Sequence, residues 1–336
     1  MTLYTVVEKD RVGDIMTKEV YSIVADEAEL KWFFDHVIQK PKVNESYSMV
    51  FVCRHKKLTK EEKASLGMAS NETEFLATQS LRLAKFSDKN AIDNKTNWTF
   101  FKFLQYVKRF EVNKEAYLTT EGQPLPDKAL VTIFYVNPCD DIKVARKLIN
   151  SLDETSDAII KAMLNGKTTA DNLQSYQAYG NIESNVKHFR ANCKGSNYWM
   201  DFDLDVPAWF KEKYFSFLTD TFNKFYGKGN YVEIETSGGY HILVKSCKNN
   251  GDPHNVCKEF QAFYAAKVAE GEEPYVDEKG VVKFECILND SQIPGLPLPG
   301  TYQYGKCVRV LNKEDFIDDC LERKKKNEKN KQNSSN

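Results

Sequence analysis

The stretch that decides the fold is NYWMDFDLDVPAWFKEKYFSFLTDTFNKFYGKGNYVEIETSGGYHILVK, residues 197–245. Its first part, YWMDFDLDV, alternates acidic and apolar side chains with the period of two that belongs to a β-strand. Asp201, Asp203 and Asp205 therefore share one face of the predicted strand. The other face carries apolar residues: Met200, Phe202, Leu204 and Val206. This pattern predicts a strand that packs on a core and presents carboxylates on its other side.

Two or three carboxylates on one strand face repel each other unless a cation lies between them. Mg²⁺ and Mn²⁺ prefer such oxygen ligands. About twenty-five residues later, YVEIETSGGYHILVK (231–245) predicts two short strands joined by Ser237-Gly238-Gly239-Tyr240-His241. The glycines permit a tight turn or close approach to a ligand, and Ser and His supply donors. Each motif alone is common in structural hairpins and surface loops, but together they predict a metal–phosphate site.

Composition and charge limit the class of protein. The chain has 336 residues, of which 41% are hydrophobic and 28% charged, and these values are typical of a globular protein with one large or two modest domains. No apolar run approaches the roughly 18 residues of a membrane span, and the first residues do not resemble a signal peptide. We therefore expect a cytoplasmic or nuclear protein without a membrane partner. The net charge of −1 argues against nucleic acid as a partner unless the basic residues form a local groove.

The cysteines give little indication of a metal site. There are eight, and no CxxC pair occurs. His254-x-x-Cys257 and Cys53-x-His55 could each be half of a zinc site, but a structural zinc site needs four well-spaced ligands. Ordinary reduced cysteines are the favoured interpretation.

Along the chain, we expect an N-terminal extension over 1–29, a catalytic domain over 30–318 and a disordered basic tail over 319–336. The domain is expected to have two modules, at about 30–190 and 191–318. The segment WTFFKFLQYVKRF (98–110) interleaves aromatic and basic residues, which could stack on single-stranded bases. A core helix with a solvated basic face is the favoured alternative.

The motifs in this order resemble the archaeo-eukaryotic primase superfamily, the primase-polymerases of archaea, eukaryotes, viruses and plasmids. The resemblance rests on Asp201-Phe-Asp203-Leu-Asp205, on the SGGYH turn (237–241), and on an acid before the Pro-Gly-Thr loop in LPLPGTYQYGKCVRVL (296–311). The segment TEGQPLPDKALVTIFYVNP (120–138) also resembles the strand that opens the family's catalytic module. The similarity extends over residues 30–312, although only three short motifs are specific.

The resemblance implies an α+β fold, with an N-terminal α/β module and an RRM-like antiparallel sheet that carries the motifs. It implies that Asp201 and Asp203 hold Mg²⁺ or Mn²⁺, with Asp205 as an alternate ligand. Asp290 would be the third acid, with Glu285 as the alternative. The remaining implied roles are contacts to the phosphates of an incoming nucleotide: Ser237, His241, the backbone N–H groups of Gly238 and Gly239, and Arg309.

The implied function is that of a DNA primase or primase-polymerase that uses two-metal phosphoryl transfer. Its partners would be a single-stranded DNA template and nucleoside triphosphates, and a virus or other mobile element is the expected source. No GxxxxGK[ST] motif occurs in the chain, so any helicase would be a separate protein. Two alternatives remain open: a metal-dependent glycosyltransferase of the DxD type, and a non-catalytic single-strand-binding replication protein on a primase-like scaffold.

Overall fold

The structure is a computed structural model. It describes residues 3–9, 15–65, 73–82, 98–111, 122–165, 182–248, 252–277, 280–289 and 293–317. Asp290 and the predicted tail over 319–336 lie outside the described residues. Every strand pair within these ranges is antiparallel, so the chain is a mixed α+β protein, as the sequence predicted. None of the described helices has the length and apolar character needed to cross a membrane.

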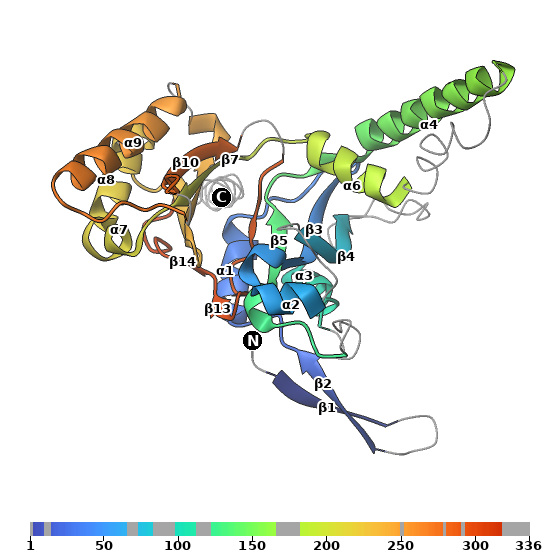
Figure 1. Ribbon diagram of the computed structural model, residues 1–336, viewed down its shortest axis with the longest axis horizontal. Coiled ribbons are helices and arrows are strands. Elements are labelled where there is room, and N and C mark those ends of the chain that lie inside the picture. The colour runs from blue at the N-terminus through green and yellow to red at the C-terminus, as the bar shows by residue number, and fades with distance from the viewer. Residues whose placement is uncertain are drawn as a thin grey trace, which may run out of the picture.

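The first sheet contains the acidic strand and the hairpin that follows it, and we call it the carboxylate sheet. Its five strands lie in the order β10 (Glu285–Asn289), β7 (Trp199–Asp205), β9 (Gly239–Lys245), β8 (Tyr231–Glu235) and β14 (Arg309–Val310). Three helices lie on one side of it (Figure 1): α7 (Ala208–Lys213), α8 (Phe215–Tyr226) and α9 (His254–Ala269).

The alternation along β7 determines which face those helices cover. Phe202 and Leu204 are fully buried in a cluster with Phe222 of α8 and Phe260 of α9. The Phe202 and Phe222 rings meet edge to face at 5.3 Å between centroids. Because successive side chains of a strand point to opposite faces, the three aspartates lie on the side away from these helices.

The second sheet is built largely from the N-terminal half of the chain. Its strands lie in the order β13 (Lys306–Cys307), β12 (Tyr302–Gln303), β5 (Leu130–Tyr135), β3 (Glu45–Arg54) and β4 (Thr73–Arg82). β11 (Gly295–Pro297) pairs with β5, and β6 (Cys139–Asp140) pairs with β3. The strands β11, β12 and β13 belong to the predicted second module by sequence, but they pair within this sheet.

Other described elements lie around the two sheets. β1 (Leu3–Lys9) and β2 (Ile15–Tyr21) form a separate hairpin, and α4 (Asp141–Leu164) projects away from the rest of the described chain (Figure 1). The remaining helices are short: α2 (Lys60–Ser65), α6 (Ile182–Asn192), and the 3-10 turns η1 (His55–Lys57), η4 (Asp127–Ala129) and η5 (Ser246–Lys248).

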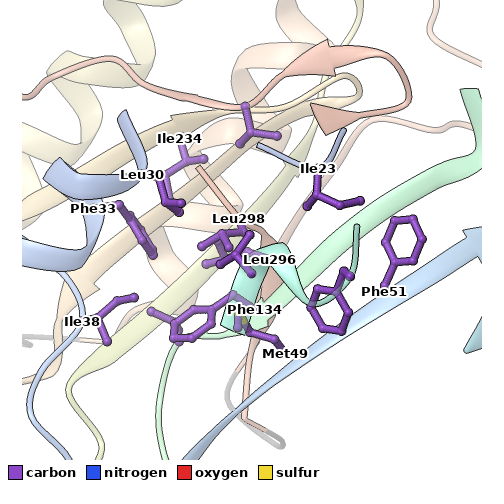
Figure 2. Packing of buried hydrophobic residues seen from close by; sticks show 14 of the residues in the cluster. Ile23, Leu30, Phe33, Ile38, Met49, Phe51, Phe134, Ile234, Leu296 and Leu298 are labelled. Atoms are coloured by element: carbon purple, nitrogen blue, oxygen red, sulfur yellow. The ribbon is translucent and has the colours of Figure 1, made fainter. Parts of the chain in front are cut away.

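A single apolar core joins the two sheets. Leu30 and Phe33 of α1 (Glu27–His36) pack with Phe134 of β5, Ile234 of β8 and Leu296 of β11 (Figure 2), and each of these residues is fully buried. This core covers the β8 side of the carboxylate sheet, on the same face as the aspartates. The face is therefore packed at one end and more open at the β7–β10 end.

The segment 98–110 belongs to this core. Its helix α3 (Phe100–Lys108) buries Phe103, Leu104 and Val107, and Phe103 packs against Phe34 with 5.1 Å between ring centroids. The core-helix interpretation is confirmed for this face of the segment.

The Pro-Gly-Thr loop contacts the start of α1. Gly300 has φ 82°, and its carbonyl accepts from the backbone N–H groups of Ala25 and Asp26 at 2.8 and 3.1 Å. A Cβ on Gly300 would lie 2.5 Å from the Leu30 nitrogen, so this contact requires glycine. In this protein the loop fixes the position of α1.

Candidate active site

Asp201, His241 and the partly buried Asn289 form a polar cluster across three strands of the carboxylate sheet. Asp201 is fully buried. Its two carboxylate oxygens lie 3.1 and 3.2 Å from His241 Nδ1, and Asn289 Nδ2 donates to its Oδ2 at 2.8 Å. The register places Asn289 directly opposite Asp201, and His241 opposite Asp203. Both oxygens of Asp201 are therefore engaged by neighbouring side chains.

The charge of His241 depends on these carboxylates. Burial by itself lowers the pKa of His241, but the nearby Asp201 and Asp203 raise it to about 9. At neutral pH the ring is therefore an imidazolium that donates Nδ1–H to Asp201. Its other nitrogen, Nε2, lies 3.6 Å from Asp203 Oδ1, within ion-pair range.

Asp203 is the carboxylate that faces outward from this cluster, with 46% of its side chain exposed. Partial burial raises the pKa of Asp203, as do the negative charges of Asp201 and Asp205, while His241 and Arg54 oppose the shift. Negative charge thus accumulates at this point of the strand, and a bound cation would relieve it.

Two further acids lie at the open end of the same face. Asp205 and Glu285 are exposed and directly opposite each other in the β7–β10 register. Side chains paired in this way have Cβ atoms about 5 Å apart. Ile287, which is neutral, stands opposite Asp203. Glu285 is therefore the third acid that the described residues supply, and Asp290 lies outside them.

The donor set suits a magnesium-type cation that is held partly by substrate. Among the described residues, no three His, Cys, Asp or Glu side chains converge as metal ligands. Mg²⁺, however, is usually held by one or two carboxylates together with water and substrate phosphates, rather than by an all-protein cage. Asp203 and Asp205 are the oxygens available for that role, because Asp201 is already engaged.

The two glycines of the SGGYH turn allow it to lie directly against the acidic strand. A Cβ on Gly239 would lie 1.7 Å from the Leu204 carbonyl oxygen, and one on Gly238 would lie 2.8 Å from Asp205 Oδ1. At Gly239 the obstacle is backbone and leaves no room for a side chain, whereas a side chain at Gly238 would require the Asp205 carboxylate to shift. The turn and the Asp205 carboxylate therefore form one continuous surface.

A cleft of about 490 Å³ opens beside this surface. Of the residues that the structure describes, three cations from distant parts of the chain line it: Lys57 of η1, Lys211 of α7 and Lys306 of β13. Ser237, Gly238 and Glu235 also line it. Burial lowers the pKa of Lys211, and its ammonium group donates to the Thr236 carbonyl at 2.9 Å. Because three lysines and a single carboxylate, that of Glu235, are described in the lining, the cleft is suited to an anionic ligand.

Ser237 has an unused hydrogen-bonding group in this cleft. Its backbone N–H donates to Gln303 Oε1 at 2.9 Å, which holds the turn against β12. Its hydroxyl oxygen is buried and has no hydrogen-bond partner within the described residues. Buried polar atoms are seldom left unsatisfied, and those that are commonly mark a ligand position.

The structure thus brings most of the predicted site residues together. Asp203, Asp205, Ser237, Gly238, Gly239 and His241 lie around one carboxylate face and one cleft. Arg309 lies apart: it pairs with Glu235, which places it on the face opposite His241, and it is not among the residues that line the cleft.

The sequence reasoning did not identify the lysines of the cleft or the role of Asn289. The basic residues that follow β3 were a visible signal for Lys57. Nothing local marks Lys211 or Lys306, because only the packing of α7 and of the β12–β13 hairpin against the turn brings them into the cleft.

Searches against protein-family models, curated proteins and solved structures found no match to this chain.

Proposed function

We propose that this protein is a metal-dependent nucleotidyltransferase of the primase-polymerase type, with a primase-like catalytic core. The observation that carries the proposal is the continuity of two features. Asp205 of the carboxylate face lies directly against Gly238, and Gly238 lines the cleft that also holds the three lysines. Polymerising enzymes need this combination, because a triphosphate must lie beside the oxygens that bind its cation.

In the proposed reaction, a 3′-hydroxyl attacks the α-phosphorus of a nucleoside triphosphate. A P–O bond forms to the attacking oxygen, the bond to the β-phosphate breaks, and pyrophosphate leaves while the hydroxyl proton passes to water. Mg²⁺ or Mn²⁺ would lower the pKa of the attacking hydroxyl and offset charge on the leaving pyrophosphate. Asp203 and Asp205 would hold the metal, with Glu285 beside them.

The other residues of the chain would bind and orient the triphosphate. Lys57, Lys211 and Lys306 supply positive charge, and the Ser237 hydroxyl is free to donate to a phosphate oxygen. Asp201 is a positioning residue in this proposal, because it holds His241 in the charged state. The imidazolium Nε2–H would then be directed toward the developing negative charge near Asp203.

A nucleotide-binding protein without transfer activity is the second candidate. The neutral residues opposite Asp201 and Asp203 on β10, Asn289 and Ile287, favour it. It would use the same cleft but would not join nucleotides. A single-strand-binding role on the same scaffold is compatible with this candidate.

The test is synthesis on a single-stranded DNA template, with and without an annealed primer. The assay would use dNTPs or NTPs with Mg²⁺ or Mn²⁺, and would compare wild type with Asp203→Asn. Asp220→Asn, an exposed acid of α8, is the matched control. We expect product from wild type and the control, and loss of about a hundredfold or more in Asp203→Asn.

Binding of the nucleotide is measured separately by calorimetry. Lys211→Gln should weaken triphosphate binding by about tenfold, which corresponds to one charge-assisted contact. Triphosphate binding without product from wild type would favour the second candidate. If triphosphate binds neither wild type nor the control, the cleft has been wrongly assigned and both candidates fail.

A further inference from the structure

A second basic cleft lies at the base of α4, beside the end of α6. Its volume is about 480 Å³, and the residues that line it are Lys143, Arg146, Lys147, Asn192, Cys193 and Lys194. Four of these six side chains are cationic and none is acidic. We propose that this cleft binds the phosphate backbone of a single-stranded nucleic acid. The identity of the polyanion as nucleic acid rests on the proposed function.

The cations of α4 form one continuous stripe. Lys143, Arg146 and Lys147 are spaced i, i+3 and i+4, so they share a face of the helix, and all three are exposed. Lys143 Nζ donates to the Lys194 carbonyl at 2.9 Å and so connects the helix to the segment that leads into β7. Within the described residues, neither Arg146 nor Lys147 forms an ion pair.

The two acids that begin α4 or precede it, Asp140 and Asp141, have partners of their own. Asp140 Oδ1 accepts the backbone N–H groups of Ile142 and Lys143 at 2.9 and 3.1 Å, as a helix cap. Asp141 is buried and paired with Arg190 at 3.1 Å. Asp140 keeps its negative charge near Cys193, but four cationic side chains line the cleft, so positive charge is in local excess although the whole chain carries −1.

The cleft lies close to the carboxylate face. Ile293 packs with Cys193, which lines the cleft, and the Ile293 N–H donates to the Ala191 carbonyl at 2.8 Å. Asn289 contacts Asp201, and Ile293 comes four residues after Asn289 in the sequence. Four residues of extended chain span at most about 14 Å. That is on the order of four nucleotides at the spacing of about 3.4 Å per strand of a duplex. One strand of modest length can therefore reach both places.

The chemistry of the lining favours a strand backbone over a free nucleotide. Among the described residues that line the cleft, none has a carboxylate to share a cation with a triphosphate and none is aromatic. Contacts made only to phosphates fix a strand in place without reading its sequence. We therefore expect binding that is independent of sequence and strongly dependent on salt.

The experiment is fluorescence anisotropy of a labelled oligothymidylate of about 20 nucleotides, in EDTA and without nucleotide, so that binding is measured apart from synthesis. The test variant is Lys143→Gln/Arg146→Gln/Lys147→Gln. The matched control removes the same charge from exposed lysines on the α8–α9 side: Lys224→Gln/Lys228→Gln/Lys258→Gln. Thermal melts of both variants check that they remain folded.

We expect the test variant to bind at least about tenfold more weakly at 0.1 M salt, and the control to bind like wild type. The slope of log affinity against log salt should fall by about 2, because each phosphate contact to a single strand contributes about 0.7. Equal losses in both variants, or no loss in the test variant, would overturn the proposal. The proposal would also be overturned if inorganic phosphate or triphosphate displaced the oligothymidylate at equal concentrations of phosphate groups. Such competition would identify the cleft as a site for small anions. A failure of synthesis in the assay described above would leave these binding results unaffected.

Discussion

The interaction between Asp201 and His241 gives the sharpest test of the site's architecture. Asp201→Asn keeps the shape of the side chain and removes its charge. In the wild type, the carboxylates raise the pKa of His241 from 6.5 to about 9 in spite of its burial. Without the Asp201 charge and its hydrogen bond, burial is opposed only by the charges of Asp203 and Asp205, and we expect the pKa of His241 to fall by about 2 units in buffer containing EDTA.

The same shift has a consequence for stability. A pKa of 9 in the folded state against 6.5 in the unfolded state differs by 2.5 units, which at about 1.36 kcal/mol per unit is about 3 kcal/mol. Because the folded pKa is the higher one, this stabilisation is complete below pH 6.5. It decreases as pH rises toward 9 and is absent above about pH 10. In Asp201→Asn, most of this pH dependence should disappear.

The assay is an NMR titration of the histidine ring carbons, with His241 assigned among the five histidines by a His241→Gln variant. Urea denaturation at pH 6, 8 and 10 supplies the free energies of unfolding. Asp220→Asn is the control and should leave the pKa of His241 unchanged. A wild-type His241 that titrates near 6.5, or an equal pKa in Asp201→Asn, would refute the reasoning. Addition of Mg²⁺ should lower the pKa of His241 in wild type, but much less in Asp203→Asn.

Three further predictions concern the scaffold. Burial raises the pKa of Glu233 from 4.5 to about 7, so the protein loses stability as pH rises between these values. Glu233→Gln should therefore stabilise the protein by about 3 kcal/mol at pH 8 and hardly at all at pH 4, as measured by urea denaturation. Gly239→Ala should destabilise the fold by more than about 3 kcal/mol, because its Cβ would overlap the Leu204 carbonyl oxygen. The control Gly122→Ala has open space around it and should cost only about 1 kcal/mol, from its positive φ. Equal shifts of the melting temperature in the two variants would contradict the prediction. Phe134→Ala should lower the free energy of unfolding by about 3–5 kcal/mol, because the ring is fully buried in the core that joins the two sheets. A decrease below about 1 kcal/mol in denaturant unfolding would show that this core is not shared.

The α+β class and the central strand could be predicted because they depend on local patterns. The alternation of Asp201, Phe202, Asp203 and Leu204 has a period that only a strand uses, and it assigned the correct residues to the helix-covered face. The two glycines of the SGGYH turn likewise indicated a close approach, which the structure places against Leu204 and Asp205.

The different environments of the aspartates could not be predicted in this way. Asp201 and Asp203 both lie between apolar residues of the same strand, yet Asp201 is fully buried and Asp203 is half exposed. The difference arises because Asn289 and His241 come from two other strands, whose register depends on the whole sheet.

The sequence by itself therefore determined which residues of β7 and of the turn face away from the core, since strand geometry fixes this within a few residues. Tertiary structure alone decided what lies opposite them. One cleft brings together Lys57, Lys211 and Lys306. The first and last of these are 249 positions apart in the sequence (306 − 57). These lysines come together because β12 and β13 pair with the sheet of the N-terminal half of the chain. Such a pairing between distant segments is set by the packing of the whole core, and it leaves no periodic signal in either segment.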